Sequence, residues 1–253
     1  MRQRIRTAAL AAAVRPASAD GISRNNMEDT MEQRLLPSFH WWRYLRPGPG
    51  NGASPSAPMR DRWRLKNGAA VAIRVAQSGD APLMQDMVRG LSMESRYHRF
   101  FYPVRELTPD LLDRFVQADP MGSMTLLAVS GKGKDEVAVG MAQCAADPYP
   151  LRGEFAVVVT DAWQRLGIAT RLLRNVICIA RAAGIERLEG DIMSDNEPMR
   201  RLLAGMGFET GIHPDGAYLE KAWKVLDQPT RDCSGLTGLV AGRSHQSQAV
   251  LHA

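Results

Sequence analysis

Hydrophobic positions near the middle of the chain follow first a strand pattern and then a helix pattern. Residues 154–160 contain an apolar Ala-Val-Val-Val core, which is typical of a central strand buried on both faces. In residues 168–183 the apolar positions return every three or four residues, at Ile168, Leu172, Leu173, Val176, Ile177 and Ala180. Gly184 follows where a helix commonly ends. The pattern predicts a strand, a tight turn and a long amphipathic helix.

The flanking segments carry similar signals. Runs rich in β-formers predict strands at 70–75, 123–129, 137–144, 188–192, from 207 and at 217–225. Helices are expected from 81 to about 91, from 108, and from 197 to about 206, because each follows a capping residue with proline in its first turn. The sum is an α/β domain with a mixed sheet and about four helices.

Composition divides the 253 residues into three parts. Residues 1–66 are rich in Arg, Pro and Gly and are expected to be a disordered extension, residues 67–226 to be the folded domain, and residues 227–253 to be a disordered tail. Residues 1–64 hold 11 arginines against 5 acids, whereas the remainder holds 21 basic and 22 acidic residues. The basic character therefore belongs to the extension, and a nucleic-acid-binding domain is not indicated.

Other classes of protein are disfavoured by the same data. No run approaches the roughly 18–20 apolar residues of a membrane span. The three cysteines are far apart and form no Cys-x-x-Cys pair, which favours a reducing cytoplasm. No His, Cys or Asp cluster has the spacing of metal ligands, so no metal is expected.

Candidate chemistry gathers at the turn between the central strand and the long helix. The pattern Gln164-x-x-Gly167-x-Ala169 lies at the positive end of the predicted helix, where backbone N–H groups attract an anion. Small residues at Gly167 and Ala169 let the backbone approach a bulky phosphate closely. Glu154 lies ten residues before Gln164, at the start of the strand. These residues predict a phosphate seat next to a carboxylate.

This segment resembles motif A of the GNAT superfamily of acetyl-CoA-dependent N-acetyltransferases, whose signature is Gln/Arg-x-x-Gly-x-Gly/Ala. Residues 196–208, an Asn followed by Gly207-Phe208, are similar to motif B of that superfamily. Residues 91–101 resemble the segment before motif A in GNAT domains of bacterial protein-lysine acetyltransferases. The resemblance covers roughly residues 69–225 and implies a GNAT fold. That fold is a mixed, mostly antiparallel sheet of about six to seven strands with about four helices, whose splayed central strands hold the cofactor.

The resemblance also implies the residues that bind acetyl-CoA. Backbone groups of Val157, Val158 and Val159 would pair with the pantetheine arm. Amides of the turn would hold the pyrophosphate, namely those of Gln164, Arg165, Leu166, Gly167, Ile168, Ala169 and Thr170. Asn196 would contact the cofactor, unless it only caps its helix.

Acetyl transfer needs a neutral amine, and an amine with a pKa of about 10.4 is deprotonated in roughly one molecule in 10³ at pH 7. Glu154 is the candidate general base, acting through water, because the resembling lysine acetyltransferases carry a glutamate at this place. The alternative is a strand-end charge or an ion pair with Arg152. A backbone N–H near Val158 is a candidate to stabilise the developing oxyanion.

The expected reaction is transfer of an acetyl group from acetyl-CoA to a primary amine, either a protein lysine or a small amine, by direct attack. Candidate acceptor contacts are Arg96, Tyr97 and Arg99, and His98 is a candidate to face the acceptor. His213 precedes a proline in a turn and is expected to be exposed to solvent.

The chain departs from motif B at Leu203, where relatives often carry a tyrosine that protonates the leaving thiolate. Water or another group, such as Tyr218, would have to replace it. The departure keeps open a second function, that of a non-catalytic sensor that binds acyl-CoA.

Overall fold

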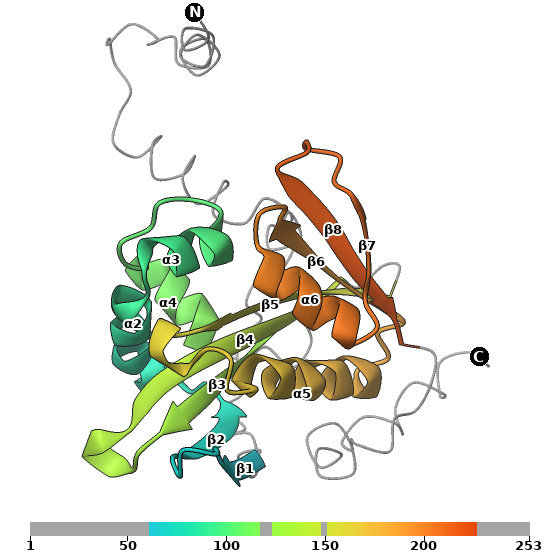
Figure 1. Ribbon diagram of the computed structural model, residues 1–253. Coiled ribbons are helices and arrows are strands. Elements are labelled where there is room, and N and C mark those ends of the chain that lie inside the picture. The colour runs from blue at the N-terminus through green and yellow to red at the C-terminus, as the bar shows by residue number, and fades with distance from the viewer. Residues whose placement is uncertain (1–60, 117–122, 148–150, 227–253) are drawn as a thin grey trace, which may run out of the picture. The chain divides into compact units, whose positions relative to one another are not determined.

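The computed structural model describes residues 61–116, 123–147 and 151–226, which form one sheet flanked by helices (Figure 1). The sheet has eight strands in the order β1-β2-β3-β4-β5-β6-β8-β7. The strands are β1 (Asp61–Arg64), β2 (Ala70–Val75), β3 (Ser123–Ser130), β4 (Val137–Asp147), β5 (Arg152–Val159), β6 (Arg187–Met193), β7 (Glu209–Ile212) and β8 (Leu219–Val225). The described residues contain five α-helices, α2 (Ala81–Gly90), α3 (Met93–Phe100), α4 (Pro109–Val116), α5 (Ile168–Ala182) and α6 (Glu197–Gly205).

The helices cover the two faces of the sheet separately. Helix α5 packs on β4 and β5. Its apolar side chains form one hydrophobic core with Phe155, Val157 and Val159 of β5. Helix α2 packs on β4, α3 on β5 and α4 on β3, and in Figure 1 these helices lie opposite α5. Side chains alternate between the faces along β5, so Glu154 and Val158 belong to the face that α2–α4 cover.

The sheet opens between its two parallel strands. β5 and β6 are paired only from Arg152↔Arg187 to Glu154↔Glu189, after which β6 continues alongside β8. Gly190 follows the last pair, and a Cβ built there would lie 2.8 Å from the ring of Phe155. Every other neighbouring pair is antiparallel, so the sheet is mixed, mostly antiparallel and splayed, which confirms the predicted fold.

Two elements differ from the sequence prediction. The predicted domain start at residue 67 is too late, because β1 pairs with β2 in residues 61–64. Asp61 accepts hydrogen bonds from Arg171 at 2.7 Å and from Asn175 at 3.2 Å, and the Arg171 guanidinium lies 4.3 Å from the Trp63 ring centroid. Polar contacts with residues distant in the chain therefore hold residues 61–64 in a strand, although the composition of this segment alone indicates no ordered structure. Helix α3, with Ser92 as its N-cap, adds a helix to the four expected.

The proposed extension 1–60 and the tail 227–253 lie outside the described residues, so their predicted disorder stays a prediction. None of the described helices is long and apolar enough to cross a membrane.

Candidate active site

The open edge of β5 presents a defined set of backbone groups. The N–H of Thr160 donates to the carbonyl of Val139 at 3.0 Å, and antiparallel partners exchange hydrogen bonds at every second residue. By this alternation Val158 is bonded to Met141, its register partner, while the backbone groups of Val157 and Val159 point away from β4 and into the opening. Of the three predicted valines, two thus face the gap. The N–H of Val158, the predicted oxyanion donor, is engaged with β4.

The turn after β5 exposes the amino end of α5. Gln164 to Gly167 are exposed to solvent, and Arg165 and Gly167 adopt left-handed φ angles of 59° and 81°. Gly167 is the N-cap of α5, and no side chain of the described residues caps the helix there. The first amides of a helix lack acceptors within it and carry its positive dipole end. The start of α5 therefore offers N–H donors suited to an anion.

Gln164, the first member of the predicted phosphate set, is used differently. Its own N–H donates to the carbonyl of Asp161 at 3.3 Å. Its side-chain amide donates to the carbonyl of Val159 at 3.2 Å and to the hydroxyl of Ser95 at 3.1 Å. Gln164 thus holds the turn against β5 and α3, and the row of available amides begins after it.

Glu154 occupies the point where β5 and β6 separate. It is half-buried and belongs to the last residue pair, opposite Glu189. Arg187 lies 2.5 Å from the Glu189 carboxylate and Arg152 lies 3.7 Å from it, so two arginines balance the neighbouring acid. The site therefore contains a carboxylate of β5 beside the opening, on the face covered by α3.

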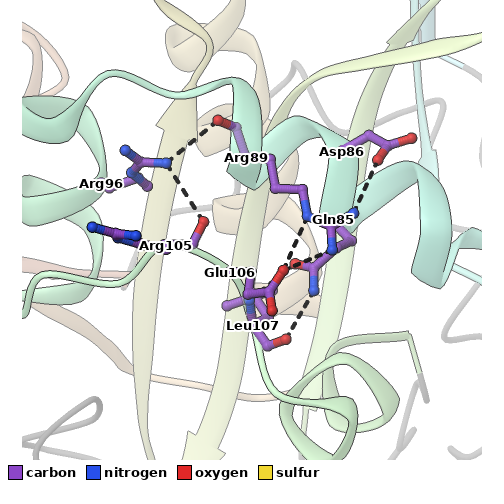
Figure 2. A network of polar contacts seen from close by, with 7 residues as sticks. All are labelled: Gln85, Asp86, Arg89, Arg96, Arg105, Glu106 and Leu107. Carbon is purple, nitrogen blue, oxygen red and sulfur yellow. Dashed lines mark hydrogen bonds and ion pairs between the residues drawn. The ribbon is translucent and has the colours of Figure 1, made fainter.

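Arg96 and Arg99 serve the packing of α3. Figure 2 shows the Arg96 guanidinium turned toward two backbone carbonyls, those of Arg89 at 3.3 Å and Arg105 at 3.5 Å. Arg99 is fully buried and donates to the side chain of Gln143, and burial lowers the pKa of its guanidinium to about 10. Among the three candidate acceptor contacts, Tyr97 alone is exposed, at 40%. The contacts of the two arginines favour a structural role.

A polar cluster that the sequence analysis did not identify ties α3 to the turn. The carboxylate of Asp161 accepts hydrogen bonds from the Ser92 N–H at 2.8 Å and from the hydroxyls of Ser92 at 2.7 Å and Ser95 at 2.8 Å. Partial burial acts to raise the pKa of Asp161, but these donors outweigh it and hold the pKa below its usual range. The available signal was Ser92 directly before a helical run, which marks an N-cap.

Replacing Asp161 by Asn should lower the free energy of unfolding at pH 7 by about 1 kcal/mol, a value discounted for solvent screening. Because the folded-state pKa is depressed, the carboxylate stabilises the fold above its ordinary value of 3.8, and this contribution is lost as the pH falls below it. Urea unfolding of both proteins at pH 7 and at about pH 3 measures the difference. A difference that does not shrink at the lower pH would contradict this assignment.

The surroundings of three further residues, Asn196, Leu203 and His213, show what each side chain does in the fold. Asn196 caps α6, since its side-chain oxygen accepts from the Met199 N–H at 3.2 Å. Leu203 is fully buried in the core, so its position offers no group to the opening. The expectation that His213 is exposed is wrong, because it is 5% exposed and lies 3.3 Å from Asp191. The Asp191 carboxylate also lies 2.8 Å from Lys221, so the buried histidine contacts a carboxylate that is itself paired.

Comparison with known proteins gives concordant results. A family model described as the acetyltransferase (GNAT) family matches residues 90–208. An acetyltransferase of Pseudomonas aeruginosa is 30% identical over 157 residues, which cover 61% of this chain and 84% of the relative.

Solved structures resemble the fold. The GNAT domain of S. lividans PAT has a TM-score of 0.61 at 22% identity and covers 69% of this chain and 100% of that domain. The protein yncA of Salmonella typhimurium, solved with its cofactor acetyl-CoA, has a TM-score of 0.50 at 21% identity and covers 63% of this chain and 96% of its own. At these identities the likeness bears on the fold alone.

Proposed function

The chain belongs to the GNAT family of acetyltransferases, and we propose that it transfers an acetyl group from acetyl-CoA to a primary amine. The observation that carries the proposal is the uncapped amino end of α5, which opens directly beyond the strand that parts from its neighbour. A helix start of this kind favours a phosphate, and the gap beside it offers the backbone groups of Val157 and the N–H of Val159 to an extended amide chain.

The residues fit acetyl-CoA in two places. Amides from Arg165 through Thr170 would hold its pyrophosphate, because they include the first amides of α5, which no side chain of the described residues caps. Backbone groups of Val157 and the N–H of Val159 would pair with the amides of its pantetheine arm, since the Val159 carbonyl already accepts from Gln164. Asn196, whose side chain already caps α6, would line the other wall of the gap.

The acid of the site would act on the acceptor. Glu154 would take a proton from the ammonium form of the amine, directly or through one water, so that the neutral nitrogen attacks the thioester carbon. The C–N bond forms as the C–S bond breaks, the nitrogen releases its second proton to solvent to become the amide, and the thiolate takes up a proton. The acceptor is a protein lysine or a small amine, and it would enter along the face that carries Glu154 and α3.

A second function has one observation in its favour. Leu203 is fully buried where relatives often carry a tyrosine, so the usual thiolate acid is missing. This favours a sensor that binds acyl-CoA without turnover. In that case the turn would still bind the nucleotide, but no amide would form.

Incubation of the full chain with acetyl-CoA and a panel of polyamines, amino acids and lysine-rich proteins separates the two functions. We expect thiol release above the rate without amine, together with an upward shift of the melting temperature by acetyl-CoA. A thermal shift without thiol release would favour the sensor. Absence of both would exclude either function for this protein.

A further inference from the structure

His98 connects the two sides of the open sheet. Its Nε2 lies 3.1 Å from an oxygen of Asp195, in the loop between β6 and α6. The same helix is held on the β5 side through Ser95, which donates to Asp161, and through Arg99, which donates to Gln143 opposite Ala156. Helix α3 therefore spans the gap between the parted strands, and His98 is the side chain that reaches across it.

The contact with Asp195 defines which imidazole nitrogen is available. A carboxylate only accepts hydrogen bonds, so Nε2 carries the hydrogen in this pair. The described residues offer Nδ1 no hydrogen-bond partner. The His98 side chain is 16% exposed and Asp195 is 72% exposed, so the pair borders both the protein interior and the solvent. A carboxylate that orients an imidazole in this way is the arrangement found in acid–base catalysis.

We propose that His98, oriented by Asp195, is the acid that protonates the leaving thiolate. The proposal rests on the acetyl transfer proposed above and supplies the group that is missing at Leu203. The imidazolium donates its Nδ1 proton to the sulfur as the C–S bond breaks. The ammonium form of the acceptor loses two protons on becoming the amide, one to Glu154 before attack and one from the nitrogen after it. One of them returns to His98 through solvent and the other is released. The net reaction converts thioester and ammonium into amide, thiol and one free proton, with no other reactant.

Other ionisable groups share the elements around His98. Asp161 lies in the turn after β5 and Glu154 on β5 itself, and Glu94 lies one turn earlier on α3. Asp161 is engaged with two serines, and Glu154 is assigned to the acceptor. Asp161, Glu154 and Glu94 are unchanged in the variants below. A loss of activity that appears only when His98 or Asp195 is replaced therefore does not come from these groups.

His98→Gln tests the proposal, because glutamine retains an N–H for Asp195 but has no transferable proton. We expect kcat to fall about 10²-fold with a nearly unchanged KM for acetyl-CoA. Asp195→Asn should reduce kcat less, in the same direction. Glu197→Gln, which removes a charge two residues away that pairs with Arg200 and Arg201, is the matched control and should leave kcat unchanged.

Binding provides a readout that does not need turnover. The unaltered protein should bind CoA about 10-fold more tightly than desulfo-CoA, since an imidazolium pairs with the sulfur, and His98→Gln should lose this preference. Thermal melting of each variant establishes that it is folded. If the unaltered protein shows turnover, and His98→Gln keeps both that kcat and the preference for CoA over desulfo-CoA, the inference is overturned while the proposed function stands. Absence of thiol release from the unaltered protein would overturn the proposed function and this inference together.

Discussion

Glu154→Gln is expected to lower kcat by about 10²–10⁴-fold while changing the affinity for acetyl-CoA little. The amide has nearly the shape of the carboxylate but cannot accept a proton, so the acceptor amine stays largely charged at neutral pH. The proposed nucleotide contacts lie further along the chain, on the edge of β5 and at the start of α5, and the substitution leaves them intact. Steady-state kinetics at saturating amine and isothermal titration with acetyl-CoA measure the two effects separately.

The pH dependence sharpens this test. With Glu154 as the base, the rise of kcat with pH in the unaltered enzyme should be displaced to higher pH in the variant, where the free amine itself becomes abundant. Glu189→Gln is the matched control, because it removes the neighbouring carboxylate, which already pairs with Arg187 and Arg152. An equal loss in both variants, or unchanged turnover in Glu154→Gln, would remove Glu154 from the mechanism.

The unit of β5, turn and α5 was predictable from sequence because its signals are local. Four consecutive apolar positions indicate a buried strand, and Gly167 tolerates the left-handed φ of 81° that a sharp entry into a helix needs. The Asn196 cap and the left-handed Gly184 after α5 follow from the same short-range rules. Each of these features depends on residues that are neighbours in the chain.

The missed features depend instead on contacts between distant segments. β1 is held by Asp61 against Arg171, and α3 is held by Asp161, which lies in the turn after β5. His213 is drawn inward by Asp191, although its local sequence is that of an exposed turn. A single sequence contains no periodic signal for such pairs. The contacts that hold β1, α3 and His213 in place could therefore be found only from the fold.

Gly190 lets β6 pack closely against Phe155 at the point where the sheet opens, and Gly190→Ala is expected to destabilise the protein. The added Cβ would lie 2.8 and 2.9 Å from two ring atoms of Phe155 and 2.9 Å from its carbonyl oxygen. The ring cannot move away freely, because it is 6% exposed and packs 5.1 Å from the ring of Phe208. β5 and β6 must therefore shift relative to each other just beyond their last pair.

We expect Gly190→Ala to lower the free energy of unfolding by about 1–3 kcal/mol, the usual cost of overpacking a core. For a domain of this size that is a fall in Tm of roughly 2–4 °C per kcal/mol. Gly205→Ala is the matched control, because a Cβ there meets nothing within 4 Å and alanine favours the helix by up to about 1 kcal/mol. Chemical denaturation of both variants measures the contrast. Equal stabilities would mean that Phe155 and β6 accommodate the added methyl group at no cost, and that the close contact at Gly190 does not matter for the fold.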